Sequence, residues 1–474
     1  MTLPRMTILN LVAANKWLAL NGLVLLAILA HSIYRDIQLE RQFPTDLRNR
    51  VVGARLQKDG LLPYHYHWQP SDGVRYYNPD EDAWLPDGRI PNDIRSRNAD
   101  INKITASPFF HELLSPICDL PQRTLSRIWF WSQYLMLFAM ICMIIRLSGK
   151  KEKQWIVLNM GILFTTTEAW KSSISTGQLY FFLSFLMCCI LTGLVNHKKL
   201  GMILAGICAA ALVLTRPFSI VFFLPLVFYF KDYLVFLGTS AGIVVTYLLY
   251  IIINPAENAL YRDYLNAMQM QVQLHQAATG TLPIHAAPVS SYTKIEGFDL
   301  QEVTRLTTKD PIPVYSENGN VFVLYYKIFH KKIPLFLLYT ILSLTLVSLS
   351  LLFLVRNRKQ PVRNLEILLF GFTLFMIVEL FSPVFRRQYN TVLWFPLVLA
   401  AFLLLPEKKN VVFFILLAGL ALNILNFNWL PLRHTLGEYL WLTGLLWLIL
   451  LPPPRRDQAD PSPLHADLLL LRSF

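Results

Sequence analysis

Charge is what this sequence has little of. Only 15% of its 474 residues are charged, whereas 54% are hydrophobic and the mean hydropathy is +0.42. This composition is too apolar for a water-soluble globular protein. The alternating pattern of a membrane β-barrel is missing as well, which leaves helices as the spanning element. We therefore expect an all-α polytopic membrane protein.

Cysteine and clustered metal ligands are also sparse. His65 and His67 place two imidazoles on one side of a strand, but no third ligand, His111 included, stands at a telling spacing. The acidic run "NPDEDAW" lacks the Gly and the terminal Glu of a calcium loop. We expect no disulfide framework, no metal and no cofactor. The five cysteines lie mostly in apolar runs as buried thiols: Cys118, Cys142, Cys188, Cys189 and Cys208.

The net charge of +13 comes from short basic clusters between apolar runs, a distribution that argues against nucleic acid as a partner. With the N-terminus inside, the inner connections hold roughly 17 Lys and Arg against about 5 in the short outer ones. Two basic pairs lie on the outer side: Arg123 with Arg127, and Lys331 with Lys332. Both border long loops, where the preference of Lys and Arg for the cytoplasmic side is weak. We predict a multi-pass protein of the inner (plasma) membrane with both termini cytoplasmic.

Apolar runs separated by breakers predict a bundle of about 10–12 transmembrane helices over residues 1–453, followed by a cytoplasmic tail, residues 454–474. The first run resembles a signal peptide, but the many later spans favour an uncleaved helix. The region from Leu200 to Phe230 could instead form a re-entrant hairpin. Twelve candidate spans begin near Trp17, Leu125, Trp155, Leu179, Leu200, Pro217, Tyr233, Ile333, Leu365, Thr391, Val411 and Leu440.

Two long segments then fall outside, residues 35–124 and 254–332, and each is expected to contain an amphipathic juxtamembrane helix. In the first, Asp46 stands in the first turn of a helix that Gly60 ends, with the arginines facing water and headgroups. In the second, Leu260 and Tyr264 share a helical spacing. An aspartate at a helix start also has simpler explanations, as a cap for backbone N–H groups or as an i,i+4 ion partner of an arginine.

Several short motifs follow in a telling order: an Asp after the first span, "GLLPY", "TASPFFHELLSPICDLP", "STGQLYFFLSFL" and "SPVFRRQYNTVLWFPLVL". In this order the chain resembles glycosyltransferase family 87 over most of residues 10–405. That family includes mannosyltransferases dependent on polyprenyl-phosphate mannose. The resemblance implies a GT-C-type helical bundle with a catalytic carboxylate in the first extracytoplasmic loop, and on that analogy Asp46 is the general base.

The chemistry that the resemblance implies needs a base for the acceptor hydroxyl and cations for the departing phosphate. Snorkelling to headgroups, or pairing with Glu168 and Glu379, would also explain the basic residues at the outer helix ends. For the donor phosphate we predict Lys171, Arg216, Arg386 and Arg387, and for substrate binding Arg50, Tyr64, Gln178, Gln388 and Tyr389.

The chain departs from the family pattern at two motifs. Ala106, Ser107 and Pro108 replace a tyrosine and two prolines, and Gln388 with Tyr389 stands where relatives have a histidine. The role of that histidine therefore does not carry over, and mannose as the transferred sugar is left open.

The leading hypothesis is an inverting membrane glycosyltransferase of the cell envelope. It would move one mannose-like hexose or pentose from a polyprenyl-phosphate donor to a lipid or glycan acceptor at the extracytoplasmic face. One alternative is a transporter or flippase of lipid-linked saccharide, which should show repeated halves, broken helices and ionisable residues deep inside spans. Another is a catalytically inactive relative that binds lipid-linked sugar.

Overall fold

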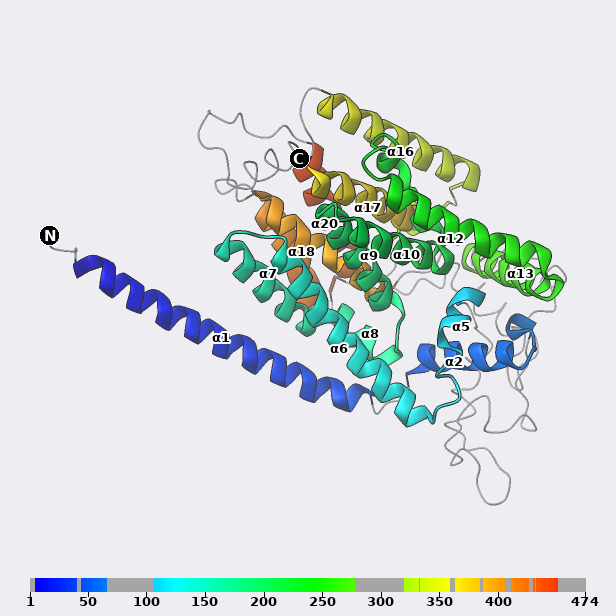
Figure 1. Ribbon diagram of the computed structural model, residues 1–474, viewed down its shortest axis with the longest axis horizontal. Helices are drawn as coiled ribbons and strands as arrows, with labels where there is room; N and C mark the ends of the chain where they lie inside the picture. The colour runs from blue at the N-terminus through cyan, green and yellow to red at the C-terminus, as the bar shows by residue number, and fades with distance from the viewer. Residues whose placement is uncertain are drawn as a thin grey trace, which may run out of the picture.

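The computed structural model describes residues 5–40, 44–65, 106–277, 319–331, 333–358, 363–383, 387–405, 411–425, 429–430 and 432–450. Throughout these ranges the regular structure is helical, with no strand (Figure 1). The prediction of an all-α membrane protein is therefore confirmed. The predicted cytoplasmic tail, residues 454–474, lies outside the described residues.

Five described helices are long and apolar enough to cross a membrane, and a sixth span results if α8 and α9 are counted as one element bent by 116°. The other predicted spans coincide with shorter helices or with mixed α and 3-10 segments. The five are α1 (Arg5–Glu40), α6 (Gln122–Arg146), α12 (Leu234–Ile253), α16 (Leu335–Asn357) and α17 (Asn364–Phe381).

The shorter helices complete the bundle and its outer layer. Those with apolar sequences are α7 (Lys151–Leu163), α9 (Tyr180–Val195), α10 (Lys199–Thr215), α11 (Leu224–Val227), α18 (Phe395–Leu404), α19 (Val411–Ile424) and α20 (Arg433–Leu450). The others are α2 (Thr45–Lys58), η1 (Pro63–His65), α5 (Pro108–Leu114), η3 (Phe164–Thr166), α8 (Glu168–Thr176), η4 (Pro217–Phe223), α13 (Pro255–Ala277), α15 (Val321–Phe329) and η6 (Gln388–Trp394).

Helix α17 lies at the centre of the bundle, and its side chains are buried almost along its whole length. Contacts with η4, α9, α18 and α20 surround it. A glycine permits the closest of these approaches, since a Cβ on Gly371 would lie 2.5 Å from the carbonyl oxygen of Phe222. One residue later, Phe372 stacks on the Phe222 ring with centroids 4.1 Å apart. These contacts hold η4, and with it the preceding Arg216, against α17.

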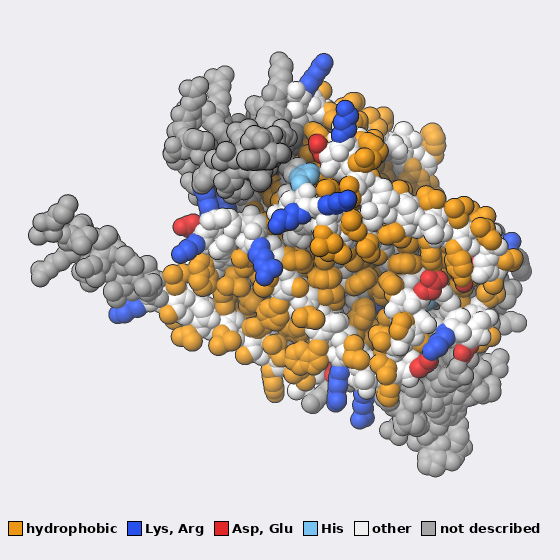
Figure 2. Space-filling model, in the orientation of Figure 1, with side chains coloured by type: hydrophobic (Ala, Val, Ile, Leu, Met, Phe, Trp, Pro, Cys, Tyr) orange, Lys and Arg blue, Asp and Glu red, His pale blue; other side chains and the backbone are white. Residues whose placement is uncertain are grey.

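Two contacts join segments that the sequence predicts on the inner side of the membrane. On the predicted inner side, the ammonium group of Lys153 donates to the carbonyl oxygen of Leu405 at 2.9 Å. The hydroxyl of Tyr233 donates to Asn364 Oδ1 at 3.2 Å on that same side. On one face of the molecule, hydrophobic side chains form a broad area, with Lys and Arg grouped beyond it on two opposite sides (Figure 2). This distribution is typical of a membrane-embedded bundle.

The first helix extends away from the bundle in its N-terminal half and contacts the other helices near its C-terminal end (Figure 1). A buried carboxylate anchors that end. Asp36, fully buried, accepts hydrogen bonds from the Tyr134 hydroxyl at 2.7 Å and from the Trp170 indole N–H at 2.6 Å. Arg35 forms an ion pair with it at 2.6 Å and also donates to the Thr165 carbonyl oxygen. These bonds tie α1 to α6, η3 and α8.

We expect Asp36→Ala to lower the free energy of unfolding by about 3 kcal/mol, because it leaves a buried hydroxyl, an indole N–H and a guanidinium without their acceptor. Thermal unfolding in detergent measures the effect. The matched control is Asp232→Ala, at an exposed aspartate, which should change stability by less than about 0.5 kcal/mol. Equal melting temperatures for the two variants would show that the anchor does not stabilise the bundle.

Candidate active site

Helix α2 forms where the sequence predicts the first juxtamembrane helix. Its apolar side chains Leu47, Val51 and Ala54 pack against Phe110 and Leu114 of α5 in a small core of their own. This packing joins the two ends of residues 35–124, the segment predicted to lie outside. It places Asp46 and Arg50, one turn apart, on a side of the helix that remains available to other elements.

The prediction that the arginines of α2 face water is wrong for two of them. Arg48 is 4% exposed and Arg55 is 3% exposed. The guanidinium of Arg55 donates to the carbonyl oxygens of Cys118, at 2.6 Å, and Leu120, at 3.3 Å. The physical reason is that the segment after α5 runs along this face of α2 and offers its backbone carbonyls as acceptors.

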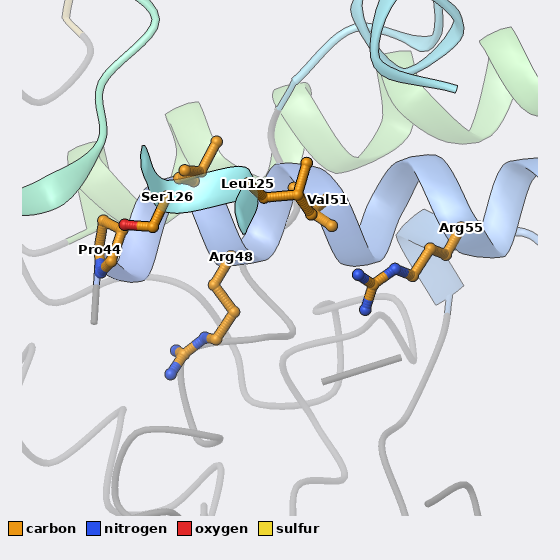
Figure 3. Close-up of a pocket in the computed structure, with 7 residues that line it drawn as sticks. Pro44, Arg48, Val51, Arg55, Leu125 and Ser126 are labelled. Carbon is orange, nitrogen blue, oxygen red and sulfur yellow. The ribbon is translucent and has the colours of Figure 1, made fainter. Parts of the chain in front are cut away.

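A small pocket lies beside these arginines. Figure 3 shows Arg48 and Arg55 extending from the same side of α2, near Leu125 and Ser126 at the start of α6. With 3.6 residues per turn, this side is opposite the one that carries Asp46. The pocket is therefore not part of the site around Asp46.

Gln178 connects Asp46 to Arg50. Its amide nitrogen donates to Asp46 Oδ2, and its amide oxygen accepts from Arg50 Nη2 at 2.8 Å. Arg50 Nη1 donates in addition to the carbonyl oxygen of Gly177 at 2.8 Å. The amide thus uses its donor on the carboxylate and its acceptor on the guanidinium, and it fixes the relative positions of both charged groups.

The break between α8 and α9 puts Gln178 in this position. Gly177 ends α8 in the left-handed conformation, with φ at +68°, and the backbone N–H of Gln178 donates to the Ser173 carbonyl oxygen at 3.0 Å. Such a helix end favours glycine. Glycine is needed for a second reason, because a Cβ at this residue would lie 2.6 Å from Leu47 Cβ and 2.9 Å from Pro44 Cβ. The "STGQ" motif therefore lets α2 approach the break.

The second cation of the site is Arg216, at the end of α10. Its guanidinium makes two hydrogen bonds to Glu379 of α17, at 2.9 and 2.6 Å, and its Cζ lies 5.6 Å from the centroid of the Tyr180 ring. The pairing with Glu379 is one of the alternatives considered from the sequence. Tyr180 in turn stacks on Tyr389, with centroids 5.7 Å apart. Asp46 lies close enough to the Tyr389 hydroxyl to interact with it electrostatically.

The other predicted phosphate ligands have different surroundings. Lys171 forms an ion pair with Glu168 at 2.6 Å, again an alternative considered from the sequence. Arg387 is half-buried, acts electrostatically on Tyr389, and begins η6 with its backbone N–H bonded to Asn390 Oδ1 at 2.8 Å. Arg386 lies outside the described residues.

Tyr64, His111 and Tyr264 form an aromatic group beside Arg50. Tyr64 is 1% exposed, donates to the Ala106 carbonyl oxygen at 2.7 Å, and its ring centroid lies 5.4 Å from that of Tyr264. Tyr264 belongs to α13, the second predicted juxtamembrane helix, which packs on η1 and α5. Burial and the nearby Arg50 lower the pKa of His111 to about 3, so its imidazole is neutral at physiological pH.

Two further predictions concern Gln388 and the metal ligands. Gln388 is half-buried at the start of η6, next to Tyr389. No three His, Cys, Asp or Glu side chains could hold a metal ion together in the part of the chain that the structure describes. His67 lies outside that part, and the five cysteines are free.

Four segments far apart in the sequence thus meet at one end of the bundle: the start of α2, the α8–α9 break, the end of α10, and the end of α17 with η6. The chain matches glycosyltransferase family 87. The match covers residues 105–298, which includes α5, the α8–α9 break, Arg216 and α13. It confirms the family resemblance and supports the assignment of the chain as a glycosyltransferase. No curated protein and no solved structure gives a significant match.

Sequence reasoning missed the contribution of three site residues. Tyr180 lies two residues after Gln178 of the "GQ" motif, and this nearness was a signal for it. Glu379 was considered only as an alternative partner, although an acid inside an apolar run is itself a sign of a buried pair. His111 was considered only as a metal ligand, and nothing local to "PFFHELL" shows that it faces Arg50.

We expect Gly177→Ala to destabilise the protein more than Gly60→Ala. Both glycines have positive φ, +68° and +72°, and each substitution therefore carries a similar backbone cost of about 1 kcal/mol. A Cβ at Gly60 meets nothing within 4 Å, whereas one at Gly177 overlaps α2. Thermal unfolding of the two variants isolates this overlap, which should add about 1–3 kcal/mol. Equal losses would mean that α2 does not depend on close approach at the break.

Proposed function

We propose that this glycosyltransferase moves a single sugar from a polyprenyl-phosphate donor to a lipid or glycan acceptor at the extracytoplasmic face of the cell membrane, with inversion at the anomeric carbon. The observation that carries the proposal is the Asp46–Gln178–Arg50 arrangement. It puts a carboxylate and a guanidinium side by side at one end of a membrane-embedded bundle. One group suits the incoming hydroxyl and the other suits the outgoing phosphate.

The reaction is one displacement. Asp46 accepts the proton of the acceptor hydroxyl while the acceptor oxygen attacks the anomeric carbon, and the bond from that carbon to the phosphate oxygen breaks. The electron pair of that bond leaves with polyprenyl phosphate. Because phosphate departs without needing a proton, one carboxylate is sufficient, in contrast to the two that glycoside hydrolysis uses. A single attack from the opposite face inverts the anomeric configuration.

Other carboxylates near the site are less suitable as the base. Glu379 holds Arg216 through two hydrogen bonds and is 3% exposed. Glu112 accepts a hydrogen bond from the Tyr247 hydroxyl at 2.9 Å, and its burial raises the pKa of its carboxyl. Asp46 is half-buried and has a neutral amide and a cation beside it.

Arginines in the site would stabilise the phosphate as its charge develops. Arg50, Arg216 and Arg387 all lie around the Tyr180–Tyr389 pair, and a guanidinium can bind two phosphate oxygens at once. Lys171 and Arg386, which the sequence predicts at the donor phosphate, are proposed as further phosphate ligands. Gln388, Tyr389 and Tyr64 are proposed to contact the substrates.

A transporter of lipid-linked saccharide is the second candidate, and one observation favours it. The 116° break between α8 and α9, together with the buried Arg216–Glu379 pair, resembles the broken helices and interior charges of transporters. The break, however, places Gln178 against Asp46, so that it helps to form the proposed catalytic site at the end of the bundle. Transfer rather than translocation is therefore the function that the geometry supports best.

We expect Asp46→Asn to lower kcat by about a hundredfold or more, the scale of general base catalysis. The assay follows radiolabelled sugar from synthetic polyprenyl-phosphate mannose, glucose or arabinose into membrane lipid extracts. The amide is nearly the same size as the carboxylate, so the melting temperature should stay close to that of the wild type.

The matched control is Asp119→Asn, an exposed partner of Lys58 at the other end of α2, which should keep full activity. If Asp46→Asn transfers sugar as fast as this control, Asp46 is not the base. If the wild type transfers none of the three sugars, while it moves labelled lipid across vesicles, the transporter reading replaces the proposal.

A further inference from the structure

His111 is a buried polar side chain whose ring nitrogens have no hydrogen-bond partner in the described part of the chain. The residue is 0% exposed, and neither Nδ1 nor Nε2 has a partner among the residues that the structure describes. Buried polar atoms are normally satisfied, and an exception destabilises the fold. A phenylalanine would fill a similar volume without that cost, as Phe110 does one residue earlier. Packing alone therefore gives no reason for a histidine here.

The surroundings of His111 belong to the site around Asp46. The imidazole stacks on the Tyr64 ring with centroids 6.0 Å apart, and Tyr64 in turn contacts Tyr264 of α13. Arg50, which shares Gln178 with Asp46, lies close enough to act on the imidazole electrostatically. Elements η1, α5 and α13 thus contribute Tyr64, His111 and Tyr264 to one buried aromatic wall beside Arg50 of α2. In this wall, His111 Nδ1 and Nε2 have no hydrogen-bond partner among the described residues.

The chemistry of this wall selects its ligand. A neutral imidazole has one N–H donor and one nitrogen acceptor, so it matches a hydroxyl group, which donates and accepts in the same way. A phosphate offers only acceptors and suits the adjacent Arg50 better. Tyr64 and Tyr264 are 1% and 9% exposed and pack on each other, so they offer no free ring face, and the two imidazole nitrogens are the groups left to meet a ligand. A hydroxyl group of a carbohydrate therefore fits here better than the phosphate or the polyprenyl chain.

We propose that His111 binds a hydroxyl group of the sugar in this site and helps to determine which sugar is accepted. This inference rests on the proposed function, because it supposes that the site around Asp46 holds a saccharide. The hydroxyl can come from the donor sugar or from a glycan acceptor, since both offer the same group. If the hydroxyl belongs to the donor sugar, a change of His111 alters the KM for the donor; if it belongs to the glycan acceptor, the change alters the KM for the acceptor.

The test variant is His111→Phe. It removes the unsatisfied nitrogens, so the melting temperature should rise by about 2–4 °C, while KM should rise at least tenfold because the site loses its hydroxyl ligand. A rise in donor KM alone assigns the hydroxyl to the donor, and a rise in acceptor KM alone assigns it to the acceptor. His111→Asn keeps a donor and an acceptor, so its KM should lie closer to the wild-type value than that of His111→Phe. The same variant provides the test if the His111→Phe protein does not fold.

The matched control is His434→Phe. His434 is 3% exposed, but its Nδ1 has a partner, Asn423 Oδ1, at 3.0 Å. Removing that imidazole breaks an existing hydrogen bond, so this variant should melt at a lower temperature with both KM values unchanged. If His111→Phe behaves like this control, or leaves both KM values at the wild-type level, His111 is a packing residue and the inference is wrong.

Ligand-induced thermal shifts separate this inference from the proposed function. Polyprenyl-phosphate mannose and polyprenyl phosphate without a sugar are added to the wild type and to His111→Phe. The variant should lose the additional shift due to the sugar and keep the shift due to the phosphate lipid. Loss of that additional shift supports the subsite even if no transfer is observed. An equal additional shift in the two proteins overturns the subsite even if transfer is active.

Discussion

The side-chain amide of Gln178 is the interaction on which the site depends. An amide can donate to an anion and accept from a cation at once, and no charged side chain can do both. It therefore holds Asp46 and Arg50 at fixed positions without neutralising either. A direct lysine or arginine contact from the same position would compete for the carboxylate, and a carboxylate would compete for the guanidinium.

Backbone geometry makes this amide available. The chain reverses by 116° between α8 and α9, and the left-handed glycine at the turn leaves room for α2 to approach. The bundle behind it supplies rigidity, since α17 holds η4 and the Asp36 cluster holds α1 and α8. The site is thus built from helix ends supported by buried helices, an arrangement that preserves catalytic geometry better than free loops would.

Hydrophobic runs and helix punctuation predicted much of the fold, because membrane helices are specified by local composition. The same is true of α2 and α13, whose apolar stripes are visible in the sequence. What local patterns could not predict was pairing across the bundle. Nothing in "TRPF" shows that Arg216 binds Glu379, and nothing near Arg55 shows that it will find the carbonyl oxygens of a segment more than sixty residues away. Motif order predicted that Asp46 and Gln178 belong to one site, although neither motif alone was specific.

The most direct test of the central claim is a structure of the protein with a non-transferable phosphonate analogue of a polyprenyl-phosphate sugar. Our account predicts density for the phosphonate at Arg50 and for the sugar ring next to the Asp46 carboxylate, on the side of the two residues that Gln178 does not occupy. The Asp46 carboxylate should lie on the face of the anomeric carbon opposite the phosphonate, with Gln178 still bound to both charged residues. A sugar bound elsewhere in the bundle, or an Asp46 carboxylate beyond the reach of an acceptor hydroxyl at that carbon, would contradict the account.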